Sequence, residues 1–298
     1  MQLYDLFVRI YSIASKVARA TKLIKPLRRT IGPIAGRFVY GLSPNTDRPF
    51  VIHGHKMFLA TRGKYPPTDM AMDRYEKGTT QLFERTIEPG MVVIDVGAHV
   101  GYYTLLAARL VGPTGKVYAF EPEPANYALL LKNIELNGYN NVEPVRKAAS
   151  NRVDFSTLFL TALDNGRHST YRHGLPESGS MIVEMTTIDA FLEAEGCPRV
   201  DFIKMDVEGA ELDVLQGMTR LIENSVQLKL VIEFNPFLLN SAGVAPTQLL
   251  NKPTSWSFKT FCIDEQKGLL PLGEINVPSL VDKLLASQSS VNLFCLRE

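Results

Sequence analysis

The pattern of apolar and polar positions changes at residue 91. From there to the end, short continuous apolar runs, typical of strands buried on both faces, alternate with stretches of helical periodicity. Strands are expected at Met91–Val96, Lys116–Phe120, Val142–Ala148, Ile182–Thr187, Asp201–Met205, Leu228–Glu233, Trp256–Ile263 and Val291–Leu296. Helices are expected at Tyr103–Val111, Pro124–Asn137, Thr187–Glu195 and Ala210–Glu223. This order predicts an α/β fold with a doubly wound, mostly parallel sheet, which binds ligands at the carboxyl ends of its strands.

Residues 1–37 follow a different pattern, that of a basic amphipathic helix. Apolar residues between Leu3 and Leu27 recur at spacings of three, four and seven, and residues 1–40 carry a net charge of +7. Two interpretations stay open. The helix packs on the body of the protein with its bases in water, or residues 1–30 lie on an anionic membrane surface.

Residues 38–90 form an extension between the tail and the α/β domain of residues 91–298. An apolar run with a central glycine predicts a hairpin at Phe50–Leu59. A helix is expected at Arg74–Thr86, before the Pro-Gly pair that ends the extension.

The composition excludes several classes of protein. Of the 298 residues, 45% are hydrophobic and 21% are charged, and the chain after residue 40 sums to −6, so neither disorder nor a nucleic-acid-binding core is expected. The three cysteines share no CxxC spacing, which argues against a zinc site or a disulfide framework and favours a reducing compartment. No apolar run reaches the length of about 18 residues that a membrane span needs. We therefore expect a cytoplasmic protein, with peripheral contact at the inner membrane surface if the tail binds lipid.

A glycine loop follows the first strand of the α/β domain. The strand ends at Asp95, and Gly97, His99 and Gly101 lead into the next helix. The glycines allow a tight turn and a close approach of a ligand to the helix N-terminus. The GxxxG spacing differs from the GxGxxG of dinucleotide sites, and Asp95 would repel a pyrophosphate. The loop favours a cationic ligand, such as the amino group of a methionine moiety.

Glu121 ends the second strand, 20 residues after Gly101. An acid at this place accepts hydrogen bonds from the two hydroxyls of a ribose. NAD and S-adenosylmethionine both carry such a ribose, so Glu121 alone does not separate them. Together with Asp95, it favours the sulfonium cofactor.

Lys204 and Asp206 share one face of the fourth parallel strand. A buried lysine needs a carboxylate partner, and Asp206 is the obvious one. Asp206, Glu233 and Asn235 stand at neighbouring strand ends and have the oxygen chemistry of a Mg²⁺ or Ca²⁺ site. Such clusters also arise by chance, so the sequence leads us to expect no metal.

Several motifs between residues 91 and 236 support one family. They are Ile94–Thr104, Ala119–Pro122, Asn133–Asn137, Thr187–Asp189, Val200–Glu211 and Val231–Phe234. With them the chain resembles the FkbM family of S-adenosylmethionine-dependent methyltransferases. The resemblance implies a class I methyltransferase fold, a Rossmann-like three-layer αβα sandwich whose sheet has seven strands, the last antiparallel. It also implies S-adenosyl-L-methionine as cofactor and O-methylation of a sugar, a glycan or a secondary metabolite.

The resemblance and the local chemistry together define the expected site. The cofactor-binding residues are expected to be Asp95, Gly97, His99, Gly101, Glu121 and Ala148. The catalytic residues are expected to be Asp206, Lys204 and His168, the last in a polar insertion that holds the acceptor or acts as a lid. Asp206, His99 and His168 are the candidates for the base. Two alternatives remain, an NAD-dependent oxidoreductase and a catalytically silent S-adenosylmethionine-binding scaffold.

Overall fold

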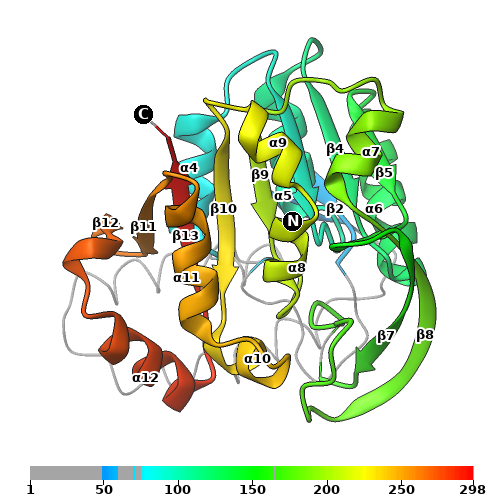
Figure 1. Ribbon diagram of the computed structural model, residues 1–298. Coiled ribbons are helices and arrows are strands. Elements are labelled where there is room, and N and C mark those ends of the chain that lie inside the picture. The colour runs from blue at the N-terminus through cyan, green and yellow to red at the C-terminus, as the bar shows by residue number, and fades with distance from the viewer. Residues whose placement is uncertain (1–48, 60–69, 71–74, 164, 298) are drawn as a thin grey trace, which may run out of the picture. The chain divides into compact units, whose positions relative to one another are not determined.

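The computed structural model describes residues 49–59, 70, 75–163 and 165–297 (Figure 1). The chain divides into two compact units, Met1–Tyr75 and Glu76–Glu298, and each is described by itself. The predicted amphipathic tail lies outside the described residues and stays a prediction. Within the described part, no helix has both the length and the apolar character of a membrane span.

The first unit contains the predicted hairpin. Strands β1 (Phe50–Ile52) and β2 (His55–Met57) pair antiparallel, with Ile52 opposite His55. The two residues between them, His53 and Gly54, have φ angles of 47° and 82°. Two consecutive positive φ angles are typical of the tight turns that join such strands, so the hairpin prediction is confirmed.

The second unit is built on an eight-stranded sheet with the order β12-β11-β13-β10-β9-β3-β4-β5. The strands are β3 (Val92–Val96), β4 (Lys116–Phe120), β5 (Val142–Val145), β9 (Phe202–Met205), β10 (Lys229–Phe234), β11 (Lys259–Asp264), β12 (Gly268–Pro271) and β13 (Val291–Leu296). β13 runs antiparallel to both of its neighbours, β10 and β11. The seven strands from β11 to β5 therefore have the order and directions of the class I methyltransferase fold. β12 is an addition, paired antiparallel at the edge.

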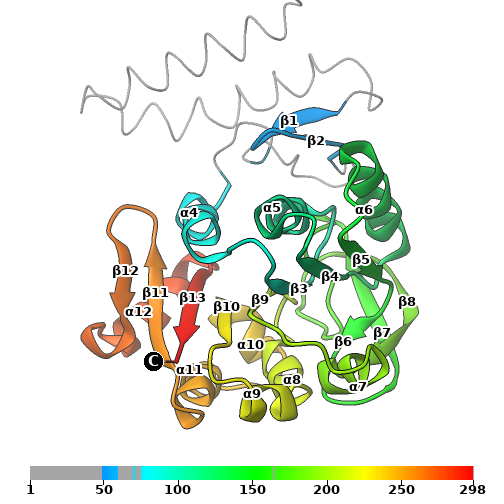
Figure 2. The same cartoon turned by 90° about the horizontal axis from the view of Figure 1, so that it is seen from above.

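Helices cover both faces of this sheet (Figure 2). One face carries α4 (Lys77–Thr86), α5 (Tyr102–Val111) and α6 (Pro124–Asn137), and the other carries α8 (Glu211–Gln216), α9 (Thr219–Asn224) and α11 (Pro246–Ser255). The remaining helical segments are α7 (Ile188–Ala194), α10 (Pro236–Ser241), α12 (Val277–Ser287) and the 3₁₀ turn η2 (Leu272–Glu274). Ile94, Ile203 and Ile232, one from each central strand, have no exposed surface. Their burial explains why these strands are continuous apolar runs in the sequence.

A second, three-stranded sheet was not predicted. The expected strand Val142–Ala148 is two strands, β5 in the main sheet and β6 (Ala148–Ala149) in the small one. β6 pairs with β8 (Glu177–Thr186), which pairs antiparallel with β7 (Asp154–Thr161). Most of the first half of β8 is exposed. The expected strand Ile182–Thr187 corresponds to the second half of β8, and the mostly exposed first half lacks the apolar run from which strands were inferred.

The predicted helix Ala210–Glu223 is wrong in one respect, because it is two short helices, α8 and α9. They are separated at Gly217 and Met218. A Cβ at Gly217 would lie 1.9 Å from the carbonyl oxygen of Ser150. The chain is thus drawn against the start of the three-stranded sheet, a close approach that only glycine allows.

Candidate active site

The loop between β3 and α5 lies directly against the chain that follows β9. A Cβ at Gly97, whose φ is +82°, would lie 1.8 Å from the carbonyl oxygen of Asp206. The amides of Gly97 and Ala98 donate to the carbonyl oxygen of Phe120, at 3.0 and 2.9 Å. The carboxyl ends of β3, β4 and β9 are thereby joined at one edge of the sheet, the place where such sheets bind ligands.

The Glu121 carboxylate is buried beside this loop. Its Oε2 accepts a hydrogen bond from the His99 amide and its Oε1 accepts one from the Glu123 amide, both at 2.9 Å. Burial raises the pKa of Glu121 to about 7, although both amides and the Asn126 side chain lower it. A carboxylate has about four acceptor positions. Glu121 therefore keeps acceptor capacity for a ligand hydroxyl.

Asp95 lies beneath the loop, at the end of β3, with 3% of its surface exposed. Its Oδ2 accepts a 2.6 Å hydrogen bond from the Thr104 hydroxyl, which ties the first turn of α5 to the strand. Burial raises the pKa of Asp95 to about 6, against the Thr104 bond and the charge of Lys204, which lower it. Direct contact between Asp95 and a cofactor stays a prediction.

Lys204 is buried among carboxylates, with 1% of its surface exposed. Its Nζ donates to Asp206 Oδ2 at 3.1 Å and lies 5.2 Å from the centre of the Tyr103 ring. Burial lowers the pKa of Lys204, but Asp206, Glu76 and Glu233 more than compensate and hold it above its usual value. The ammonium group thus stays charged and fixes the Asp206 side chain, as the sequence suggested.

Two further acids are buried near Asp206. Burial raises the pKa of Glu233 well above its usual value, and the charges of Asp206, Glu208 and Glu211 raise it further. Oε1 of Glu211 accepts hydrogen bonds from two preceding backbone amides, at 3.1 and 3.3 Å. Burial raises the pKa of Glu211 to about 7. This edge of the sheet is strongly acidic and suits a positively charged ligand.

Hydrogen bonds hold the segment between β7 and β8 against this edge. The Ser169 hydroxyl donates to the carbonyl oxygen of Glu208 at 2.8 Å, and His173 Nε2 lies 2.8 Å from the same oxygen. Asn165 Nδ2 donates to Asn126 Oδ1 at 2.6 Å, and Asn126 Nδ2 donates to the Asn165 carbonyl at 2.9 Å. The segment is thus held both before α8 and at the start of α6.

His168 lies in this segment, but its ring is already engaged. The Thr161 amide donates to His168 Nδ1 at 3.2 Å. The accepting nitrogen carries no proton, so a neutral ring carries its proton on Nε2. His168 could therefore act as the base only if the bond from the Thr161 amide were broken.

The loop, the strand ends and the covering segment enclose a small cavity. Its volume is about 60 Å³, well below the 300–1,000 Å³ or so of typical small-molecule pockets. A cofactor-sized ligand therefore needs more room than this cavity offers. The predicted residues that line the cavity are Gly97, His99, Glu121, Ala148, His168 and Asp206.

Three predicted residues are outside the lining. Asp95, Gly101 and Lys204 lie in the strands and the helix start around the cavity. Asn126 and Glu208 are among the lining residues that the sequence analysis did not place in the site. Asn126 gave no signal, because a polar residue in the first turn of a helix is common. An acid at this place in the sequence is typical of the first turn of a helix, but α8 begins only at Glu211, so Glu208 lies in the loop before it.

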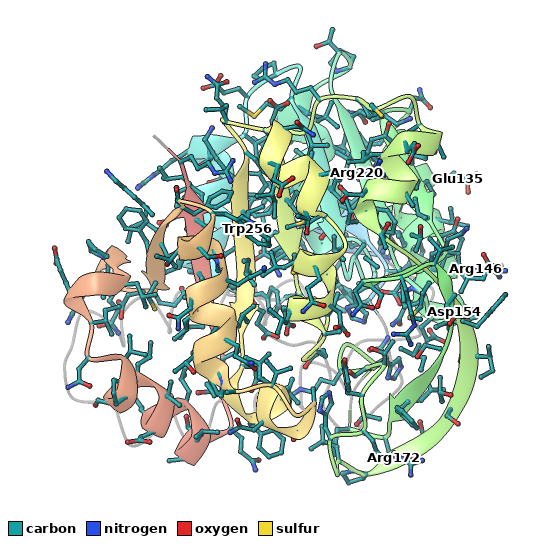
Figure 3. The ribbon with its side chains drawn as sticks, in the orientation of Figure 1. Glu135, Arg146, Asp154, Arg172, Arg220 and Trp256 are labelled. Atoms are coloured by element: carbon teal, nitrogen blue, oxygen red, sulfur yellow. The ribbon has the colours of Figure 1, made fainter. Side chains whose placement is uncertain are left out.

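A larger cavity, of about 500 Å³, lies at the opposite edge of the sheet, between α7 and α9. Its charged side chains neutralise one another. Arg220, which Figure 3 labels on α9, is 2.8 Å from Glu193 and 3.8 Å from Asp189. The Arg199 guanidinium is 2.6 Å from Asp201. The smaller cavity is the candidate functional site, because Gly97, the buried Glu121 and the segments that follow β3, β4 and β9 line it.

Comparison with known proteins identifies the family of the chain. The profile of a family described as "Methyltransferase FkbM domain" matches residues 95–254. Hexuronic acid methyltransferase AglP of Haloferax volcanii is 29% identical over 154 residues, which are 51% of this chain and 59% of that protein. Methyltransferase 1 of Beauveria bassiana is 31% identical over 144 residues, 42% of this chain and 57% of that protein. The chain thus spans less than two thirds of the length of these relatives.

A solved structure of an FkbM methyltransferase, from Methylobacillus flagellatus KT, is also similar. It has 13% sequence identity and a TM-score of 0.43, and the match covers 76% of this chain and 52% of that one.

Proposed function

The chain belongs to the family of methyltransferases defined by the FkbM domain, and we propose that it transfers a methyl group from S-adenosylmethionine to a hydroxyl group of a sugar or glycan. The observation that carries this proposal is that Gly97, Glu121 and Asp206 line one cavity at the carboxyl edge of the sheet. The first two are suited to hold the cofactor. The third is suited to take a proton from the acceptor.

The residues present fit an adenosyl cofactor. Glu121 is buried and keeps acceptor capacity for the ribose hydroxyls. Phe120 and Ala148 give the cavity apolar walls beside it. The acids on the other side, Asp206 and Glu208, complement the positive charge of the sulfonium and ammonium groups. When bound, S-adenosylmethionine would supply a methyl group bonded to a positively charged sulfur, and this methyl group would pass to an oxygen nucleophile as the carbon–sulfur bond breaks.

The chain's own residues would prepare the acceptor. Asp206 would accept the proton that the hydroxyl loses, a contribution of typically 10²–10⁴-fold in rate. Lys204 holds Asp206 in place through the 3.1 Å bond from its ammonium group. The segment with Asn165 and Ser169 would keep water out once a ligand is bound.

The proposal that the acceptor is a sugar or glycan is based on the name of one relative. AglP is named as a hexuronic acid methyltransferase, and the matched part includes half of this chain. Two observations bear on the alternatives. An NAD-dependent oxidoreductase is disfavoured because the chain belongs to a methyltransferase family. It is also disfavoured because the acids at this site would repel the pyrophosphate of NAD. A silent S-adenosylmethionine-binding scaffold differs from an enzyme only in turnover.

The experiment that tests the proposal follows a labelled methyl group. The full chain is incubated with S-adenosylmethionine labelled in the methyl group and with oligosaccharides that carry hexuronic acids or neutral sugars. We expect label on a sugar oxygen, and little label with Asp206→Asn. Cofactor binding without transfer to any of these acceptors would contradict the proposal.

A further inference from the structure

Three carboxylates meet at the acidic edge of the sheet. Asp206 and Glu208 follow β9 and Glu233 is in β10, and each offers an oxygen atom within 4.8 Å of the other two. Oxygen ligands on opposite sides of a Ca²⁺ ion, at 2.3–2.6 Å from it, are about 5 Å apart, and ligands of the smaller Mg²⁺ are closer together. The three oxygens are therefore close enough to share one divalent cation.

Glu233 gives an independent indication of a missing ligand. It is 8% exposed, and its Oε2 is buried without a hydrogen-bond partner among the described residues. A buried carboxylate oxygen without a donor is unfavourable, so such groups are normally satisfied by a side chain, water or metal. A cation between Glu233 and its two neighbours would supply the missing partner.

The charge balance of the cluster points the same way. Lys204 is the buried base at this place, and Asp206, Glu76, Glu233 and Asp95 all act on it electrostatically. One ammonium group neutralises one carboxylate. Buried carboxylates beyond the one that Lys204 pairs with are unfavourable as anions, so a divalent cation bound among them would stabilise their charged form.

The backbone presents Glu208 in a fixed way. Its φ of 53° is in the left-handed region, which is costly for a residue with a side chain. The hydrogen bonds that Ser169 and His173 make to its carbonyl oxygen, both 2.8 Å long, hold this conformation. Asn235, which the sequence analysis grouped with Asp206 and Glu233, instead caps α10 through a 3.4 Å bond to the Leu238 amide.

We infer that Asp206, Glu208 and Glu233 bind one divalent cation of the oxygen-preferring kind, Mg²⁺, Mn²⁺ or Ca²⁺. The inference replaces the expectation of no metal, and it stands on the cluster itself. Only the role of the ion rests on the proposed function. A cation at this edge would coordinate the acceptor hydroxyl and make its proton easier to remove.

The test uses Mn²⁺ as the probe, because the free ion is counted directly by electron paramagnetic resonance. The full chain, freed of metal with a chelator and containing no cofactor, is titrated with Mn²⁺. We expect one ion per chain, displaced by Mg²⁺ or Ca²⁺, and at least tenfold weaker binding for Glu208→Gln. The matched control is Glu223→Gln, an exposed acid on α9, which should bind like the wild type. If the free Mn²⁺ equals the added Mn²⁺ throughout a titration of the wild type into the millimolar range, the inference is overturned.

Two further measurements exclude trivial explanations. Melting curves establish that Glu208→Gln is folded, and Glu233→Gln, which removes the second strand's ligand, should lose the ion as well. If either folded variant binds Mn²⁺ as tightly as the wild type, the assigned ligands are wrong. Titration with S-adenosylhomocysteine in chelator tests the proposed function separately. Cofactor binding without Mn²⁺ binding overturns the metal site alone, and Mn²⁺ binding without cofactor binding overturns the proposed function alone.

Discussion

The carbonyl oxygen of Asp206 occupies the space that a side chain on residue 97 would need, since a Cβ at Gly97 would lie 1.8 Å from it. The proposed cofactor loop and the proposed base are therefore in direct backbone contact. Any change that moves one must move the other. This contact gives a third reason for the glycine, besides the tight turn and the close approach of a ligand that the sequence suggested.

The first prediction concerns this contact. Gly97→Ala should lower the free energy of unfolding by about 3 kcal/mol or more, because it adds a steric clash to an unfavourable positive φ. Gly138→Ala is the control. Gly138 also has a positive φ, of +68°, but open space around its Cβ position, so the cost should be about 1–2 kcal/mol. Urea unfolding of both variants checks this, and equal losses would show that the contact is not tight.

The second prediction concerns pH and Glu211, whose folded pKa of about 7 is above the ordinary value of 4.5. Between these values the folded state holds a proton that the unfolded state releases. The contribution of Glu211 to stability therefore falls as pH rises from about 4.5 to about 7, by up to about 3 kcal/mol. Glu211→Gln keeps an acceptor for the two backbone amides and removes the titration.

Urea unfolding at several pH values, in chelator, measures the effect. As pH rises through this interval, the unfolding free energy of the wild type should fall relative to that of Glu211→Gln. Glu223→Gln, an exposed acid on α9, should follow the wild type. A constant difference between wild type and Glu211→Gln would show that Glu211 ionises normally.

The third prediction separates catalysis from structure at Asp206. Asp206→Asn keeps the shape and an acceptor for Lys204 but loses the charge. Single-turnover rates should fall by about 10²-fold or more, with less than about tenfold change in cofactor affinity. If Asp206 served only to neutralise Lys204, the variant would be less stable but fully active in its folded fraction.

Much of this account was accessible from the sequence, for a physical reason. Central parallel strands are covered on both faces, so Val92–Val96 and Lys229–Phe234 had to be continuous apolar runs, and their ends marked the site. The Lys204–Asp206 pair followed from the cost of burying an unpaired lysine. The sheet was predictable because its strands are buried, and the Lys204–Asp206 pair was predictable because its two residues are close in the sequence.

The features that were missed depend on contacts between distant segments. β7 and β8 pair as a hairpin. Most of the first half of β8 is exposed, so no apolar run indicates this pairing in the sequence. The paired amides of Asn126 and Asn165 join residues 39 positions apart. Gly217 breaks the helix because Ser150 lies against it. Local periodicity contains no information on any of these contacts.

The fourth prediction concerns the Asn126–Asn165 bonds, which hold the cavity closed. Asn165→Ala removes the 2.6 Å side-chain bond, worth about 0.5–1.5 kcal/mol. Outward movement of the segment becomes easier, so the association rate of S-adenosylhomocysteine should rise about two- to tenfold in stopped-flow measurements. Asn224→Ala, which removes an exposed bond on α9, should bind at the wild-type rate. An unchanged rate for Asn165→Ala would show that the segment does not limit access.

The fifth prediction concerns Glu121, whose two oxygens each accept a backbone amide. Glutamine presents an oxygen to only one of them, so Glu121→Gln should cost about 1–3 kcal/mol of stability as well as the bonds to the ribose. The variant is therefore compared at a temperature where its melting curve shows it to be folded. Glu135→Gln, which changes an exposed acid on α6, is the matched control.

Isothermal titration of these proteins with S-adenosylmethionine and S-adenosylhomocysteine tests the central claim most directly, because it asks whether the cavity between the glycine loop and the acidic strand ends holds this cofactor. The account predicts dissociation constants in the micromolar range for the wild type and Glu135→Gln, and at least tenfold weaker binding for folded Glu121→Gln. No heat with the wild type at several hundred micromolar ligand, or equal affinity of folded Glu121→Gln and wild type, would contradict it.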